Sequence, residues 1–170
     1  MIQVRNLTRS YGDLMAVDDI SFGVSGGRFT GFVGGNGAGK TTTIRHMMGF
    51  IKPDEGSVTI RGLDATASSP EVKRYVSYIP GEINFPGDMS GQEFLQQQMH
   101  LAGRGDWAYA EELIDLLQLD ARANVRSMSK GMKQKTAIVS AFASDADILI
   151  MDEPTTGLDP LMRDYFLDLV

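Results

Sequence analysis

The chain has 170 residues, of which 42% are hydrophobic, a composition typical of one globular domain and not of a disordered or membrane-spanning chain. Its formal net charge of −6 predicts no general basic face, so we expect no nucleic-acid partner. There is no cysteine, which excludes disulfides and thiolate metal sites. The isolated His46 and His100 are interpreted as structural residues. No secretory pattern opens the chain, and we expect a cytoplasmic protein.

The first part of the chain predicts strands and one helix. Alternating apolar residues indicate strands at Ile2–Leu7 and Ile20–Val24. The segment Arg28–Val33 is dense in apolar residues, and we predict a strand that is buried on both faces. A glycine-rich loop follows it and leads into a helix over Thr41–Met48, which Gly49 ends.

The middle of the chain continues with short elements. A turn at Pro53–Gly56 precedes an alternating strand that contains Val58 and Ile60. Ser69-Pro70 is typical of a helix start, with Ser69 as the N-cap and proline at the first helical position. Tyr75–Ile79 then predicts another strand.

A helical block follows. Ser90 to Glu93 forms a capping-box pattern, and Asp106 and Ser129 are predicted to cap two further helices. The block ends at the buried strand Ile148–Met151. We therefore predict an α/β domain with a core over residues 1–87 and 146–170 and a helical insertion over residues 88–145.

The last predicted helix starts at Asp159-Pro160 and carries an apolar stripe. A parallel sheet needs such a helix to return to a strand, and none follows. We therefore expect the chain to be a C-terminally truncated piece of a longer protein.

The segment Gly34–Thr41 satisfies the phosphate-loop pattern, with the predicted strand before it and the predicted helix after it. Glycines let successive backbone N–H groups converge on phosphate oxygens, and the helix adds the positive end of its dipole. Lys40 is predicted to bind the outer phosphates and Thr41 to ligate Mg²⁺. The alternative is a flexible glycine-rich turn with an exposed lysine.

Two acids follow the strand Ile148–Met151. A carboxylate at the end of a parallel strand faces a phosphate loop, so we predict that Asp152 holds Mg²⁺ through water. Glu153 points differently and is the candidate general base that polarises the attacking water. The alternative is that both are solvated acids that close a strand.

The stretch Ser127–Lys135 is a capped helix start with a glycine that permits close approach. Together with the acid pair downstream, it resembles the signature segment of ABC ATPases. Ser129 and Gly131 match the signature, whereas Lys130 and Met132 depart from its commonest form, as in some bacterial drug- and peptide-export subunits. The run Asp152–Asp159 resembles the acid pair and dimer-contact loop of the same family.

This resemblance covers essentially the whole chain and implies a P-loop NTPase core with an N-terminal antiparallel β subdomain and an inserted helical subdomain. It implies an ATPase that is the motor subunit of an ABC transporter, peripheral at the inner face of the membrane. It also implies a homodimer or paired ATPase subunit that sandwiches ATP, and a separate transmembrane permease. The implied nucleotide-binding residues are Tyr11, which stacks on adenine, Gly34, Asn36, Gly37, Ala38, Gly39, Lys40, Thr41, Thr42, Glu82, Ser129, Gly131 and Asp159.

Some positions depart from the family pattern. Gly81-Glu82 stands where the family has a glutamine, so Glu82 substitutes for it or the γ-phosphate sensor is weakened. The switch histidine is absent, and we expect the 170 residues alone to bind ATP or ADP with little or no turnover. Two alternatives stay open: a non-transport ABC ATPase associated with ribosomes or DNA, and an ATP-binding regulatory module without turnover.

Overall fold

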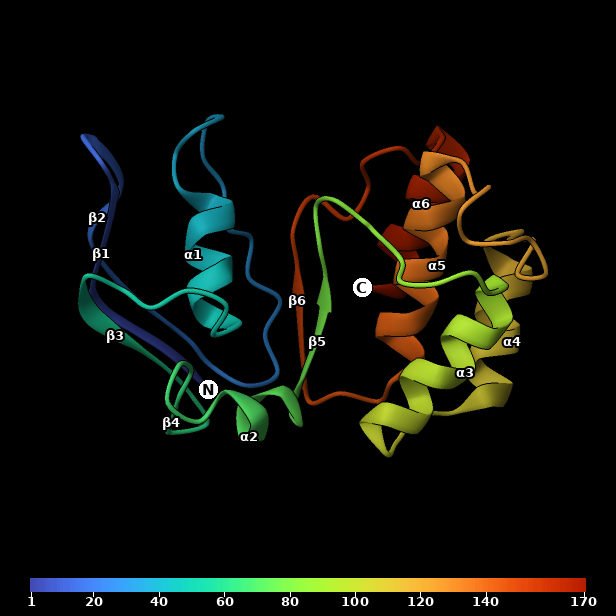
Figure 1. Cartoon of the computed structure of the whole chain (residues 1–170), viewed down its shortest axis with the longest axis horizontal. Coiled ribbons are helices and arrows are strands. Elements are labelled where there is room, and N and C mark those ends of the chain that lie inside the picture. The colour runs from blue at the N-terminus through green and yellow to red at the C-terminus, as the bar shows by residue number, and fades with distance from the viewer. The chain divides into compact units, whose positions relative to one another are not determined.

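Six strands and six helices form in the computed structural model, which describes all 170 residues (Figure 1). The chain divides into two compact units, a first unit over Met1–Tyr75 and a second unit over Val76–Val170. The predicted division into a core and a helical insertion over residues 88–145 is a different one and stays a prediction.

The first unit is built on an antiparallel sheet of β1 (Ile2–Tyr11), β2 (Leu14–Val24), β3 (Glu55–Ile60) and β4 (Leu63–Asp64), in the order β2-β1-β3-β4. The strands expected from alternation are therefore confirmed. Ile2 and Val4 alternate with exposed residues and lie in the core, and an irregularity in the pairing between Val4 and Leu7 places Leu7 in the core as well.

Two helices complete the first unit. Helix α1 (Lys40–Met47) follows the glycine-rich loop and packs against β2 and β3, while Gly49 leaves the helix with a φ of 65°. Helix α2 (Ser69–Lys73) starts one residue earlier than predicted. Its N-cap is Ser68, and Ser69 is already helical, so the N-cap prediction for Ser69 is wrong. The cap side chain makes no hydrogen bond there, which leaves no specific capping interaction to fix the start.

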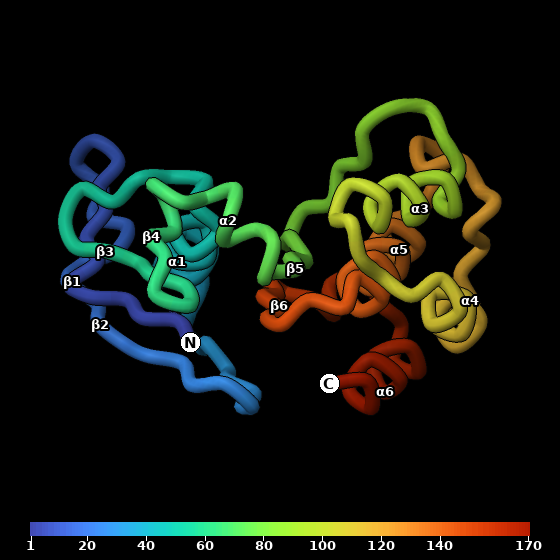
Figure 2. The backbone as a smooth tube through the Cα atoms, turned by 90° about the horizontal axis from the view of Figure 1, so that it is seen from below, coloured from blue at the N-terminus to red at the C-terminus, as the bar shows by residue number.

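The second unit places four helices beside a parallel pair of strands (Figure 2). The strands are β5 (Val76–Ile79) and β6 (Ile148–Met151), and the helices are α3 (Gly91–Ala102), α4 (Trp107–Leu116), α5 (Lys130–Ala143) and α6 (Pro160–Leu169). Helix α5 packs against β5, α3 and α4 and supplies much of the core of this unit. The capping box of α3 is confirmed, because the Ser90 and Glu93 side chains each accept the other residue's backbone N–H.

The prediction of a buried strand at Arg28–Val33 is wrong in this structure. The segment is assigned no strand, and its apolar side chains are exposed, Phe29 at 73% and Val33 at 91%. A strand requires ladder partners, and none of the described strands pairs with this segment. An apolar composition favours the burial of a segment, but it does not provide the partner strand that a place in a sheet requires.

No helix of the protein combines the length and apolar character required to span a membrane.

Candidate functional site

The phosphate loop has a backbone that requires glycine. Gly37 and Gly39 have φ values of 81° and 82°, in the left-handed region that residues with a Cβ rarely adopt. A Cβ at Gly39 would lie 2.3 Å from the carbonyl oxygen of Ala16 in β2. Gly39 is the N-cap of α1 and offers no side-chain acceptor. The first-turn N–H groups of α1 are therefore uncapped by a side chain, as an anion site at a helix N-terminus needs.

Lys40 folds over this loop. Its Nζ atom donates hydrogen bonds to the carbonyl oxygens of Gly34 and Gly35, at 2.8 Å each. These contacts hold the ammonium group against the backbone of the loop. Asn36 and Ala38 are exposed on the same loop.

Two threonines lie in the first turn of α1. Thr41 is exposed and Thr42 is half-buried, so the hydroxyl group of Thr41 is accessible to a ligand. The next residue, Thr43, donates its hydroxyl to the Gly39 carbonyl at 2.9 Å and has a structural role.

Tyr11 ends β1 and is 44% exposed. Its partner in the hairpin is Leu14, only two residues from Ala16, which Gly39 approaches closely. The expected adenine-stacking residue and the phosphate loop therefore meet the same stretch of the β1–β2 hairpin.

The two acids after β6 occupy different environments. Asp152 is 4% exposed, and its N–H donates to the Ile79 carbonyl at 2.9 Å, which continues the pairing of β6 with β5. Glu153 is exposed and has a φ of 49°, a strained value for a residue with a Cβ. The Thr156 hydroxyl donates to Glu153 Oε2 at 3.3 Å. The two carboxylates are thus suited to separate tasks.

The segment after β5 runs beside Asp152. A Cβ at Gly81 would lie 3.5 Å from Asp152 Oδ2, an ordinary contact distance. Glu82 is exposed and lines a pocket of about 300 Å³ whose wall is formed by Gly81, Glu82, Ile83, Asn84, Lys130, Lys133 and Gln134.

The signature segment forms the start of α5. Ser129 is the N-cap, and its Oγ atom accepts the Met132 N–H at 3.2 Å. A Cβ at Gly131 would lie 2.9 Å from the Gly157 carbonyl oxygen, so only glycine permits this approach of helix and loop. Asp159 caps α6, with its Oδ1 atom accepting the Met162 N–H at 3.0 Å. Both predicted ligands therefore also have a structural role as helix caps.

Sequence reasoning gave Gln134 no role. Its side chain is 2% exposed, and its Nε2 atom donates to the Pro154 carbonyl oxygen at 2.6 Å, directly after Glu153. Its place in the sequence could have indicated a buried role, because Gln134 is a polar residue on the buried stripe of α5 that also carries Ile138.

The candidate residues are shared between the two units. The first unit carries Tyr11 and Gly34–Thr42, and the second carries Glu82, Ser129, Gly131, Asp152, Glu153 and Asp159.

The predicted magnesium ligands have the type of ligand atom that this ion prefers. Thr41 offers a hydroxyl oxygen and Asp152 a carboxylate oxygen, and Mg²⁺ prefers oxygen ligands. No group of three or more His, Cys, Asp or Glu residues gathers to form a metal cage.

Comparison with known proteins identifies relatives. The family described as "ABC transporter" matches residues 17–156. The Nod factor export ATP-binding protein I of Cupriavidus metallidurans is 36% identical over 168 residues, which cover 96% of this chain and 55% of the relative. The protein of the same description from Cupriavidus pinatubonensis is also 36% identical, with 96% of this chain and 52% of the relative covered. The chain thus spans about half the length of these curated relatives.

Solved structures of ABC transporter proteins also resemble this chain. An ATP-binding subunit of an ABC transporter superposes with a TM-score of 0.86 at 31% identity, covering 99% of this chain and 72% of that one. A dimeric bacterial ABC transporter cassette superposes with a TM-score of 0.88 at 23% identity, covering 99% of this chain and 81% of the other, and shows the likeness of fold. The α/β P-loop fold predicted from the sequence is confirmed.

Proposed function

Because this chain belongs to the ABC transporter family and corresponds to its ATP-binding subunit, we propose that it binds and hydrolyses Mg-ATP as the motor of a transporter. The observation that carries the proposal is the loop ahead of α1. Its left-handed glycines, its helix N-terminus without a side-chain cap and the inward-folded ammonium of Lys40 together form a receptor for a multiply charged phosphate chain.

Lys40 exchanges its two carbonyl partners for the outer phosphates when ATP binds. The backbone N–H groups of Gly37, Gly39 and Lys40 surround the same phosphates, and the Ala38 N–H exchanges its 3.2 Å hydrogen bond to the Gly35 carbonyl oxygen for a phosphate oxygen. Tyr11 stacks on adenine. Lys40 and the backbone N–H groups of the loop thus balance the negative charge of the phosphates, although the protein has a net charge of −6.

Thr41 and Asp152 would hold the magnesium ion, which neutralises phosphate charge when it is bound. Glu153 accepts the proton of the attacking water. Its exposure and its separation from the buried Asp152 leave its carboxylate available for that task. The hydrogen bond from Thr156 to Glu153 Oε2 orients the base.

Two copies of this chain, or this chain and a paired ATPase subunit, close head to tail around ATP. Ser129 and Gly131 of one copy meet the γ-phosphate bound by Lys40 of the other copy. A helix N-terminus suits that anion, and closure then depends on the γ-phosphate. Asp159 lies in the loop that contacts the partner.

A separate transmembrane permease converts this closure into transport, and the protein acts at the inner face of the membrane through that permease. The curated relatives are described as export proteins, which supports export as the direction.

The test is Glu153→Gln in the natural protein. Glutamine keeps the shape and the hydrogen bond from Thr156 but accepts no proton, so ATP binding should persist while turnover falls by about 10²–10⁴-fold. Blocked hydrolysis should trap an ATP-dependent dimer in size-exclusion chromatography. Adding Ser129→Arg should return it to monomer by obstructing the γ-phosphate site. Turnover at the wild-type rate would refute the role of Glu153 as base and the trapping argument together.

A further inference from the structure

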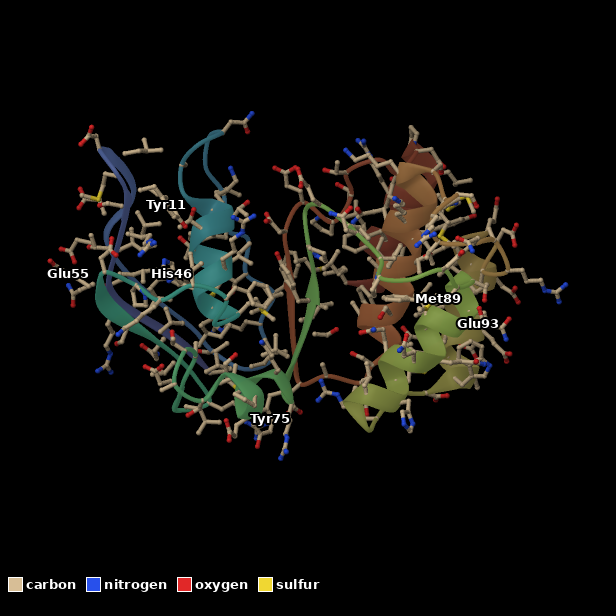
Figure 3. All side chains as sticks on the ribbon, viewed as in Figure 1. Tyr11, His46, Glu55, Tyr75, Met89 and Glu93 are labelled. Atoms are coloured by element: carbon tan, nitrogen blue, oxygen red, sulfur yellow. The ribbon has the colours of Figure 1, made fainter.

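Arg9 and Tyr11 form a stacked pair on β1. Residues two apart on a strand share one face, and the guanidinium carbon of Arg9 lies over the Tyr11 ring, 4.8 Å from its centroid. Tyr11 is still 44% exposed, so the ring remains accessible to a ligand. Figure 3 labels Tyr11 near the turn that joins β1 and β2. The Tyr11 ring therefore contacts the cation of Arg9, and the rest of the ring is accessible to a ligand.

The guanidinium group of Arg9 is also held by the turn ahead of β3. Arg9 Nη1 donates to Asp54 Oδ1 at 2.6 Å and lies 3.4 Å from the Lys52 carbonyl oxygen. Asp54 is fixed in turn, because its Oδ2 atom accepts the Ser10 N–H at 2.7 Å. This hydrogen bond and the charge of Arg9 lower the pKa of Asp54. The turn ahead of β3 anchors the arginine, and the arginine supports the tyrosine.

This pair lies on the part of the hairpin that meets the phosphate loop. Arg9 pairs with Val17 across the hairpin, and the adjoining Ala16 is the residue whose carbonyl a Cβ at Gly39 would strike. The first unit alone brings these groups together. A nucleotide whose phosphates occupy the N-terminus of α1 would therefore have its base within the neighbourhood of Tyr11.

We propose that Arg9, held by Asp54, is a positioning residue that strengthens the binding of the nucleotide's base at this site. The inference rests on the proposed function, in which Tyr11 stacks on adenine. A fixed guanidinium keeps the ring in one orientation before the base arrives, so less side-chain freedom is lost on binding. The cation also draws electron density from the ring, which favours offset stacking against the electron-rich purine.

The experiment compares Mg-ATP with Mg-tripolyphosphate, which offers the phosphates without a base. Both are titrated by calorimetry into the natural protein and into Arg9→Met, which keeps an unbranched apolar stem and removes the guanidinium group with its charge. We expect Arg9→Met to weaken ATP binding about three- to tenfold and to leave tripolyphosphate binding unchanged. Arg9→Lys should recover part of the ATP affinity, since an ammonium still attracts the ring. Arg5→Met, an exposed arginine on the same strand, is the matched control.

A double variant separates positioning from a general effect on folding. If Arg9 acts through Tyr11, Arg9→Met combined with Tyr11→Ala should bind ATP no more weakly than Tyr11→Ala alone. Equal weakening toward ATP and tripolyphosphate, or unchanged ATP affinity in Arg9→Met, would overturn the inference and leave the phosphate-binding function intact. Unchanged ATP affinity in Tyr11→Ala would overturn the inference together with the base-stacking role. Failure of the unmodified protein to bind either ligand would instead overturn the proposed function.

Discussion

Replacing Gln134 by leucine should reduce turnover without weakening ATP binding. Gln134 is buried at 2% exposure, and its amide donates to the Pro154 carbonyl at 2.6 Å. The residue before Pro154 is Glu153, whose φ of 49° is strained and needs support from its surroundings. Leucine fills a similar volume but donates no hydrogen bond, so the loop should lose that support without a large cavity.

The size of the effect follows from the contact. A hydrogen bond contributes about 0.5–1.5 kcal/mol net, and an unsatisfied buried acceptor costs about 1–3 kcal/mol. The free energy of unfolding should therefore fall by about 1–3 kcal/mol. If the same energy favours the conformation of Glu153 that is competent for hydrolysis, turnover should fall about tenfold, because 1.4 kcal/mol corresponds to a factor of ten. That loss is smaller than the one expected for Glu153→Gln.

The assay is steady-state ATP hydrolysis by the natural protein, with ATP affinity measured separately by calorimetry. Gln97→Leu, the same substitution at an exposed position of α3, is the control and should change neither quantity. Reduced stability with an unchanged turnover number would show that the position of Glu153 does not depend on Gln134, and would refute the reasoning. A loss of ATP affinity equal to the loss of turnover would refute it as well.

Three further outcomes are expected. Gly39→Ala should destabilise the protein by about 2 kcal/mol or more in urea denaturation, since its φ of 82° and the approach of the Ala16 carbonyl both exclude a Cβ. Ser90→Ala should cost about 1 kcal/mol in the same assay through the lost capping box, and an unchanged midpoint would contradict that role. Burial lowers the pKa of His46 below its ordinary value of 6.5, so the unfolded chain binds the proton more readily and stability should fall as the pH drops through 6.5 toward the folded pKa. His46→Leu should reduce that pH dependence, whereas His100→Gln, at an exposed position, should retain it.

Most local features of this protein follow from residues that are neighbours in the chain, with the N-cap of α2 as an exception. The capping box at Ser90, the caps at Asp106 and Ser129 and the helix after the phosphate loop all formed where their patterns indicated. These features depend on atoms three or four residues apart, so the residues that define them are neighbours in the chain. The glycines of the phosphate loop are local features too, because a left-handed φ is a property of a single residue.

Contacts between distant segments depend on the tertiary structure. Arg28–Val33 has the composition of a buried strand, yet a strand needs a partner that no single segment contains. The hydrogen bonds of Gln134 to Pro154 and of Arg9 to Asp54 depend on how helices and strands pack. Sequence periodicity indicates which face of an element is buried, but the partner that each buried polar group finds is set by register and packing across the fold.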